Sequence, residues 1–204
     1  MIEIKETFCT TVLLEDIVLP NTWNLTVTLI PNQNKNKLYN KAMERIQYYI
    51  FEVLDNSIFV GCHNLSKIVD FPFKAQVHVF PDDPWDHLIA MCLYTKINAM
   101  CEEVFFVDSI TINSHQARGI SHNFSEADGG NSNLLDLFED EPDLEQYVKY
   151  WYKPTPQMFL LSEGLKLVEQ DWSESELEFE DKSSGTVVTL KDFKKPRKGD
   201  DDTV

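Results

Sequence analysis

The spacing of apolar residues between Trp23 and Asn113 changes repeatedly, and these changes constrain the fold more than any other feature of the sequence. Alternation of apolar and polar residues predicts a β-strand, whereas apolar spacings of three and four predict an amphipathic α-helix. The resulting order is strand, helix, strand, strand, helix, strand. This order predicts an α+β fold with a ferredoxin-like βαββαβ core.

The boundaries of the core elements follow from where each pattern starts and stops. The expected strands are residues 23–30, 57–62, 75–80 and 104–113, and the expected helices are residues 38–54 and 84–100. Asp83 and Pro84 suit the N-cap and the first position of the second helix. An extra N-terminal strand is expected at residues 3–14, followed by a turn at Pro20 and Asn21.

Negative charge is concentrated in the second half of the chain. Residues 1–118 contain 14 Asp/Glu and 9 Lys/Arg, whereas residues 119–181 contain 16 and 3. Residues 182–204 contain 4 and 6, which completes the net charge of −16. A surface potential of one sign attracts partners of the opposite sign. The distribution therefore predicts a basic partner for residues 119–181.

Composition divides the chain into four expected regions. They are an α+β core domain at residues 1–113, a long polar loop at 114–133, an acidic helix and β-hairpin extension at 134–190, and a charged tail at 191–204. Within this acidic, β-rich C-terminal extension, Pro142 is expected to interrupt a helix at residues 134–151. Glu163 and Gly164 are expected to turn a pair of strands between residues 157 and 172.

Bulk properties disfavour several classes of function. A pI near 4.6 argues against direct binding of nucleic acid and against docking on an anionic membrane. The chain has no secretory signal at its start and no apolar run long enough to span a bilayer. Its four cysteines have no paired spacing and are expected to be reduced. These features predict a cytoplasmic location, in a cell or an infected host, or a place in a virion.

The five histidines form no complete catalytic or metal-binding motif. HExxH, nucleophile-elbow, P-loop and dinucleotide-binding patterns are all absent. His115, His122 and Asp128 are the best set for a metal bound from one loop, which would suit a small metal-assisted hydrolase. Asp82, Asp83, Asp86 and His87 form an acidic cluster before a helix, which could bind a divalent cation, but helix capping explains every residue of it except His87. The sequence therefore predicts no catalytic residue, no metal site and no cofactor.

Acidic and aromatic residues of the extension are the candidate partner-binding residues. Glu174, Glu176, Glu178 and Glu180 alternate along the chain, so a strand would place their carboxylates on one face. A helix beginning at Leu134 would group a second acidic set. Aromatic side chains are frequent interface anchors, although these also suit burial at the junction with the core. The full set is Asp136, Glu139, Asp140, Asp143, Tyr147, Tyr150, Trp151, Glu174, Glu176, Glu178 and Glu180.

Three hypotheses of function follow. The first is a non-enzymatic binding or assembly subunit that docks its acidic segment on a basic protein partner or on neighbouring subunits. A viral particle or a host-takeover complex would suit such a subunit. The second is a DNA-mimic inhibitor of a nucleic-acid-binding protein, because a carboxylate ladder resembles a row of phosphates. The third is the hydrolase, which predicts a pocket with converging polar groups.

Overall fold

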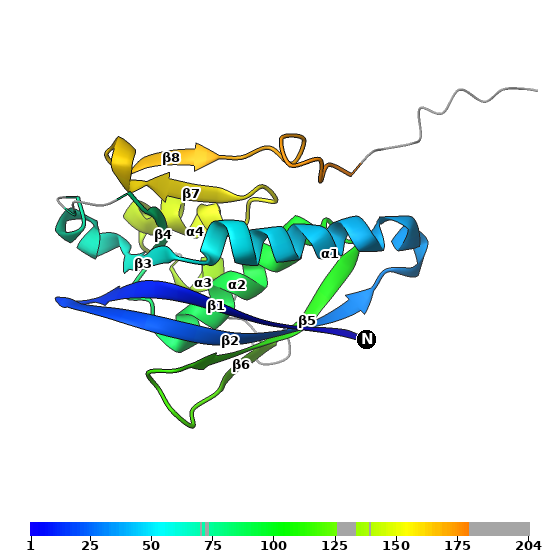
Figure 1. Cartoon of the computed structure of the whole chain (residues 1–204), viewed down its shortest axis with the longest axis horizontal. Coiled ribbons are helices and arrows are strands. Elements are labelled where there is room, and N and C mark those ends of the chain that lie inside the picture. Colours follow the sequence, from blue (N-terminus) through cyan, green and yellow to red (C-terminus); the bar gives the residue numbers. More distant parts are fainter. Residues whose placement is uncertain (70, 72–73, 126–133, 139, 180–204) are drawn as a thin grey trace, which may run out of the picture.

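One mixed sheet organises the described part of the chain (Figure 1). The computed structural model describes residues 1–69, 71, 74–125, 134–138 and 140–179. Within them the strand order is β6-β5-β2-β1-β3-β4-β7-β8. The strands are β1 (Ile2–Leu14), β2 (Ile17–Pro31), β3 (Ser57–Gly61), β4 (Gln76–Phe80), β5 (Phe105–Ser114), β6 (His122–Ser125), β7 (Gln157–Leu160) and β8 (Lys166–Glu169). The protein is thus α+β, with a larger sheet than a simple ferredoxin-like fold has.

Two long helical segments cross this sheet, and shorter ones close its connections. The segments are η1 (Gln33–Leu38), α1 (Tyr39–Tyr48), its continuation η2 (Tyr49–Leu54), η3 (Cys62–Lys67), α2 (Asp86–Cys101), α3 (Leu134–Leu137), η4 (Pro142–Leu144), α4 (Glu145–Trp151) and η5 (Leu161–Glu163). The predicted order of elements between Trp23 and Asn113 is confirmed. Helix α2 begins later than expected, because Trp85 rather than Asp83 is its N-cap.

The ferredoxin-like arrangement of these elements is not confirmed. Strand β1 lies between β2 and β3, antiparallel to the first and parallel to the second. Strands β3 and β4 are also parallel neighbours. In a split βαβ unit, by contrast, two parallel strands are not neighbours, because an antiparallel strand lies between them. The β1–β2 hairpin pairs along all of β1 and occupies the edge of β2 that a later strand would have used. The connection through η3 brings β4 back parallel to β3 instead of forming an antiparallel hairpin.

The turn of that hairpin lies earlier than predicted. Glu15 and Asp16 connect the strands, with Glu15 at a positive φ of 52°. Pro20 lies inside β2, opposite Thr11. It is tolerated there because the pairing of β2 with β5 extends only to Trp23, so the missing N–H leaves no β5 partner unpaired. The expectation of a turn at Pro20 was therefore wrong.

An aromatic row connects the sheet to the C-terminal helix. The ring centroids of Trp23 and Phe8 are 6.4 Å apart, those of Phe8 and Phe59 are 6.3 Å apart, and those of Phe59 and Phe80 are 5.1 Å apart. Trp151 of α4 completes the row, with its centroid 4.7 Å from that of Phe80. All five side chains are buried in the main core, which α1 and α2 also enter. Offset aromatic pairs of this kind add to the stabilisation from burial.

The C-terminal part of the described chain continues the same sheet. Strand β7 pairs with β4, and β8 pairs with β7. The predicted strand pair is confirmed, and Gly164 adopts the positive φ of 70° that its turn requires. The short strand β6 lies in the segment that was expected to be a loop, where it pairs with β5.

Candidate functional site

The segment from α3 to α4 presents the first acidic cluster. Leu134 and Val148 are each 1% exposed and anchor the segment in the core. Asp140, Glu141 and Asp143 are exposed on its outer side. The expected break at Pro142 is confirmed, since Pro142 starts η4. Glu139 lies outside the described residues. Asp136, Asp143 and Glu145 lie in short helices, and Asp140 and Glu141 lie in the connection between α3 and η4.

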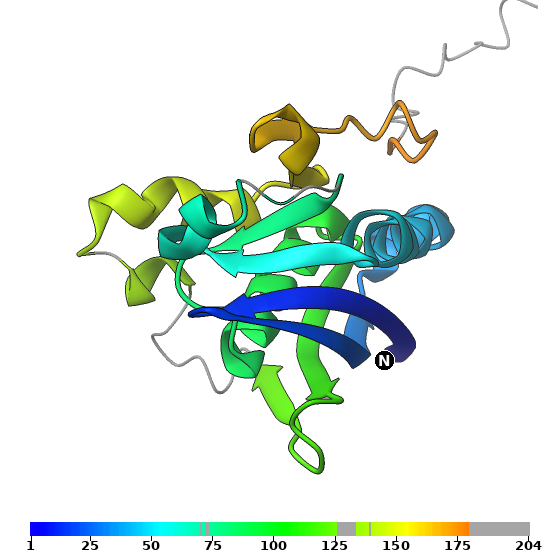
Figure 2. The same cartoon turned by 60° about the vertical axis from the view of Figure 1, so that its left-hand side comes forward.

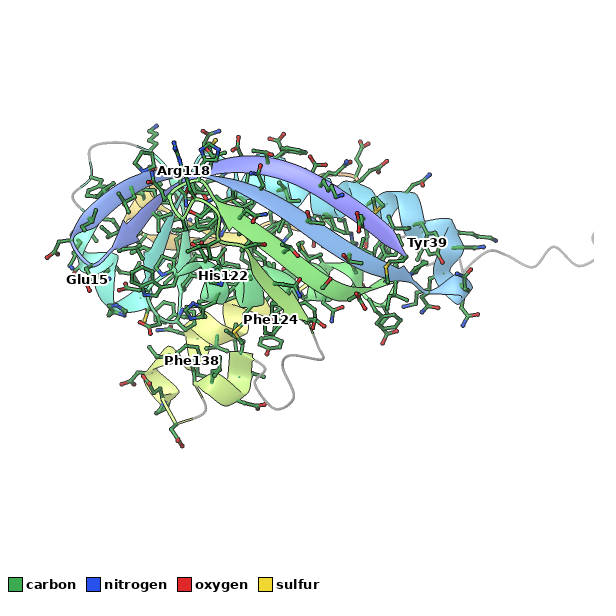
Figure 3. The ribbon with its side chains drawn as sticks, turned by 90° about the horizontal axis from the view of Figure 1, so that it is seen from below. Glu15, Tyr39, Arg118, His122, Phe124 and Phe138 are labelled. Carbon is green, nitrogen blue, oxygen red and sulfur yellow. The ribbon has the colours of Figure 1, made fainter. Side chains whose placement is uncertain are left out.

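A groove of about 360 Å³ lies within this cluster. Phe138, Pro142 and Val148 contribute its apolar lining, and three carboxyl-bearing residues, Asp136, Glu141 and Glu145, contribute its polar lining. We call it the acidic groove. Figure 3 labels Phe138, which lies at the α3–α4 segment. The groove therefore combines apolar surface with negative charge, which a partner of mixed basic and apolar character would complement.

The aromatic candidates mostly support this surface from beneath. Tyr150 and Trp151 are 4% and 0% exposed. Trp151 Nε1 donates to the Val79 carbonyl at 3.2 Å. Tyr147 is half-buried against a smaller hydrophobic cluster that includes Ile58 and Val77. Tyr150 and Trp151 thus lie in the junction between α4 and the sheet and cannot contact a partner directly, which is the alternative that the sequence left open.

Buried polar groups that sequence analysis missed hold this junction together. Lys96 is 0% exposed, and its Nζ donates to the carbonyls of Tyr150, Lys153 and Thr155 at 3.2, 3.0 and 2.8 Å. Burial lowers the pKa of Lys96 to about 7. A lysine within a helical pattern normally points to solvent, so no local signal distinguishes this one. Its role is to close the C-terminal end of α4 over α2.

His78 is the second buried polar group at the junction. Its Nδ1 lies 2.7 Å from the hydroxyl of Tyr150, and its Nε2 lies 2.9 Å from the carbonyl of Val53. Burial lowers the pKa of His78 to about 4, so the ring is neutral near neutral pH. With both ring nitrogens engaged and no exposed surface, His78 is a structural residue.

The second acidic cluster does not form the predicted strand. Glu174 and Glu176 lie in a turn that spans residues 172–176, and Glu176 has a positive φ of 60°. Glu178 follows in an irregular segment, and Glu180 lies outside the described residues. The Leu177 N–H donates to the Trp172 carbonyl at 2.8 Å, which closes the turn. Glu174, Glu176 and Glu178 therefore make no regular carboxylate ladder.

The segment 172–179 is instead attached to α1 through Arg45. The guanidinium of Arg45 lies 4.7 Å from the centre of the Trp172 ring and 3.5 Å from that of Phe179. Arg45 is 2% exposed, and its Nε donates to the Leu177 carbonyl at 2.7 Å. Its Nη1 pairs with Glu102 at 2.5 Å. Figure 2 shows this segment and the α3–α4 segment at separate places on the molecule, so the acidic candidates do not share one surface.

A larger pocket lies between the β1–β2 hairpin and the start of α2. Its volume is about 560 Å³, and most of its lining is apolar, including Leu14, Leu19 and Trp85. Its polar lining includes Asp86, His87 and His122. We call it the hairpin pocket. Figure 3 labels His122 on β6 and, at the tip of the hairpin, Glu15. Two residues of the predicted capping cluster and one predicted metal ligand thus meet in one place.

Asp86 is the unusual residue of the hairpin pocket. Its Oδ2 is shielded from solvent and has no hydrogen-bond partner in the described part of the chain. His122 Nε2 is 4.0 Å away, which is too far for a hydrogen bond. The rings of His87 and His122 have centroids 6.4 Å apart. Burial raises the pKa of the Asp86 carboxyl, and the two histidines oppose that shift. The site therefore contains an unused hydrogen-bond acceptor.

The remaining predicted site residues do not assemble into a catalytic or metal centre. His115 is exposed, and Asp128 lies outside the described residues. His63 lies 3.2 Å from Asp83, in a separate pair in which the histidine is half exposed and the aspartate is largely buried. Among the residues that the structure describes, no three His, Cys, Asp or Glu side chains are grouped as metal ligands would be. The described helices include none that is long and apolar enough to cross a membrane.

Comparison with known proteins adds no assignment. The sequence matches no protein-family model, and no curated protein matches it significantly. The geometry of the acidic groove is therefore the main guide to function.

Proposed function

We propose that this protein is a non-enzymatic binding or assembly subunit that docks a basic, partly apolar segment of a protein partner in the acidic groove. The observation that carries the proposal is the combination of an apolar lining with Asp136, Glu141 and Glu145 in a single groove of about 360 Å³. A purely solvated acidic face would have no such apolar lining.

Charge complementarity supports a basic partner. Residues 134–151 contain six Asp/Glu and one Lys. That lysine, Lys149, pairs with Glu145 at 2.6 Å, and both side chains are more than half exposed. Such an exposed pair is worth about 0–1 kcal/mol, so a partner can displace it easily. Opposite charges on the partner would steer its approach and raise the association rate.

Exposed apolar side chains support direct contact with a protein. Leu135 and Leu137 of α3 are 43% and 50% exposed, although Leu134, the first residue of the same helix, is buried. The Leu135 N–H donates to the hydroxyl of Tyr152 at 3.4 Å, which ties α3 to the end of α4. Leu135 lines the groove, and Leu137 is exposed on the same helix, so the two leucines would extend the apolar contact of a docked segment. Interfaces commonly have this arrangement of apolar centre and polar rim.

The DNA-mimic alternative has less support than the docking hypothesis. A mimic requires carboxylates at regular intervals on rigid elements, and Glu174, Glu176 and Glu178 occupy a turn and an irregular segment. Of the two described residues of the hydrolase alternative, His122 lines a pocket and His115 does not. Neither alternative accounts for the apolar lining of the acidic groove.

The proposal can be tested with a fluorescent amphipathic peptide of alternating Lys and Leu pairs, measured by anisotropy against the full chain. Glu141→Gln with Glu145→Gln should weaken binding by roughly 3–10-fold, because each exposed charge pair is worth about 0.2–1 kcal/mol. Binding should also weaken as salt rises.

The matched control is Glu174→Gln with Glu176→Gln, which removes the same charge from the separate 172–179 segment. This control should change the affinity less than twofold. Equal losses in both double variants would show that the peptide responds only to net charge, and the groove would not be its site. Absence of binding to the unaltered chain at low salt would also contradict the proposal.

A further inference from the structure

The hairpin pocket has features that the proposed docking function does not use. It lies between β1, β2, the start of α2 and β6, whereas the acidic groove lies on α3, η4 and α4. Its volume of about 560 Å³ falls within the usual range for small-molecule sites. The two sites share no lining residue. The hairpin pocket can therefore be considered, and tested, on its own.

The walls of the hairpin pocket favour a flat apolar ligand. Leu14 and Leu19 from the hairpin contribute aliphatic surface, and Trp85 contributes an indole that is 50% exposed. His87 and His122 add two further rings, 6.4 Å apart between centroids. Exposure of half an indole to water is unfavourable, and a stacked ligand ring would cover it. Aromatic and aliphatic walls of this kind suit a planar ring more than a sugar or a chain of hydroxyls.

The polar groups of the hairpin pocket show which end of a ligand would be recognised. Asn21 Nδ2 already donates to Ser114 Oγ at 2.7 Å, and the Gln116 N–H donates to Asn21 Oδ1 at 3.3 Å. The hydrogen-bonding groups of these residues are therefore already paired with one another. Asp86 is the exception, because its side chain lines the pocket, is 18% exposed, and has an inner oxygen, Oδ2, to which no described residue donates. A partly buried carboxylate with incomplete hydrogen bonding is costly, so a ligand N–H that met its exposed part would be favoured.

From these observations we propose that the hairpin pocket binds a planar aromatic small molecule that carries a cationic N–H donor, with the ring against Trp85 and the donor on Asp86. A cation is favoured over a neutral amide because charge-assisted hydrogen bonds to a carboxylate are stronger. The same carboxylate disfavours an aromatic acid, because two like charges would be brought together in a partly buried site.

Benzamidine is a suitable probe, because it is planar, cationic and carries paired N–H donors. We expect millimolar benzamidine to shift the indole N–H signal of Trp85 in ¹H–¹⁵N spectra of the full chain. Trp85→Phe assigns that signal among the four tryptophans. Benzamide, of equal shape but neutral, should bind at least threefold more weakly, and benzoate should cause no saturable shift.

Two variants locate the probe. Asp86→Asn keeps the shape of the side chain and should remove the preference for benzamidine over benzamide. Ala117→Trp places a large ring at a position that lines the pocket and should abolish binding while leaving Asp86 unchanged. Unaltered signals from the buried indole of Trp151 would show that each variant remains folded.

Several outcomes would overturn the inference. They are the absence of any saturable shift of Trp85, equal binding of benzamidine and benzoate, or a benzamidine preference that persists in Asp86→Asn. None of these outcomes would affect the peptide experiment on the acidic groove, so the two proposals can fail separately.

Discussion

The guanidinium of Arg45 lies 3.5 Å from the centre of the Phe179 ring, and this contact joins α1 to the last described residue of the chain. The same guanidinium donates to the Leu177 carbonyl at 2.7 Å. A cation held over an aromatic face with its hydrogen bonds satisfied is favourable even when it is largely buried. Arg45 is thus the residue that holds the segment 172–179 against the core.

Arg45→Ala should destabilise the protein by about 2–4 kcal/mol, because it removes buried hydrogen bonds and leaves the carbonyls of Leu177 and Met100 without a donor. Urea unfolding measures the change. Arg45→Lys is the control that keeps the charge. It should recover only part of the loss, because a lysine ammonium cannot stack flat on the aromatic rings or donate several hydrogen bonds in the fixed geometry of a guanidinium. Equal stability of Arg45→Ala and the unaltered protein would contradict the role given to this contact.

Lys96 should make stability rise with pH above neutrality. Its folded pKa is lowered to about 7 from 10.5, so between these values the unfolded chain binds more protons than the folded one. Unfolding free energy then increases with pH in this window, by up to about 1.4 kcal/mol per unit. Below about pH 7 the lysine is protonated in both states and adds no further pH dependence.

The measurement is urea unfolding of the unaltered protein and of Lys96→Met between pH 7 and 9.5. Methionine has a similar shape but no titratable group, so its profile should lack this rise. Because other groups titrate in the same window, the difference between the two profiles carries the information. A difference that is flat, or that falls with pH, would show that the ammonium form is well accommodated by the three carbonyls around it.

Glu176→Gly distinguishes the turn in the structure from the strand that the sequence predicted. At a φ of 60° glycine is favoured over glutamate, so the substitution should leave stability unchanged or raise it by about 1 kcal/mol. In a strand interior the same substitution would lower stability. Thermal unfolding separates the two outcomes, and Glu174→Gly, at a residue without a positive φ, is the matched control.

The sequence by itself determined the type and order of the elements between residues 23 and 113. Leu25, Val27 and Leu29 alternate with polar residues because one face of β2 is buried. This alternation is a local pattern, and it would be the same in any fold that buries that face of the strand. The break at Pro142 and the turn at Gly164 are local for the same reason. Each depends on a backbone preference of one residue rather than on a distant partner.

Only the tertiary structure decided which strands pair and which polar residues meet. The position of β1 between β2 and β3 depends on contacts between segments far apart in the chain, which no local period encodes. Asp86 and His122 meet because β6 pairs beside β5 and brings His122 to the start of α2. Lys96 is buried because three carbonyls from the distant α4 end converge on it. Burial and hydrogen bonding of this kind depend on the completed fold, so they could not be predicted from residue type or spacing.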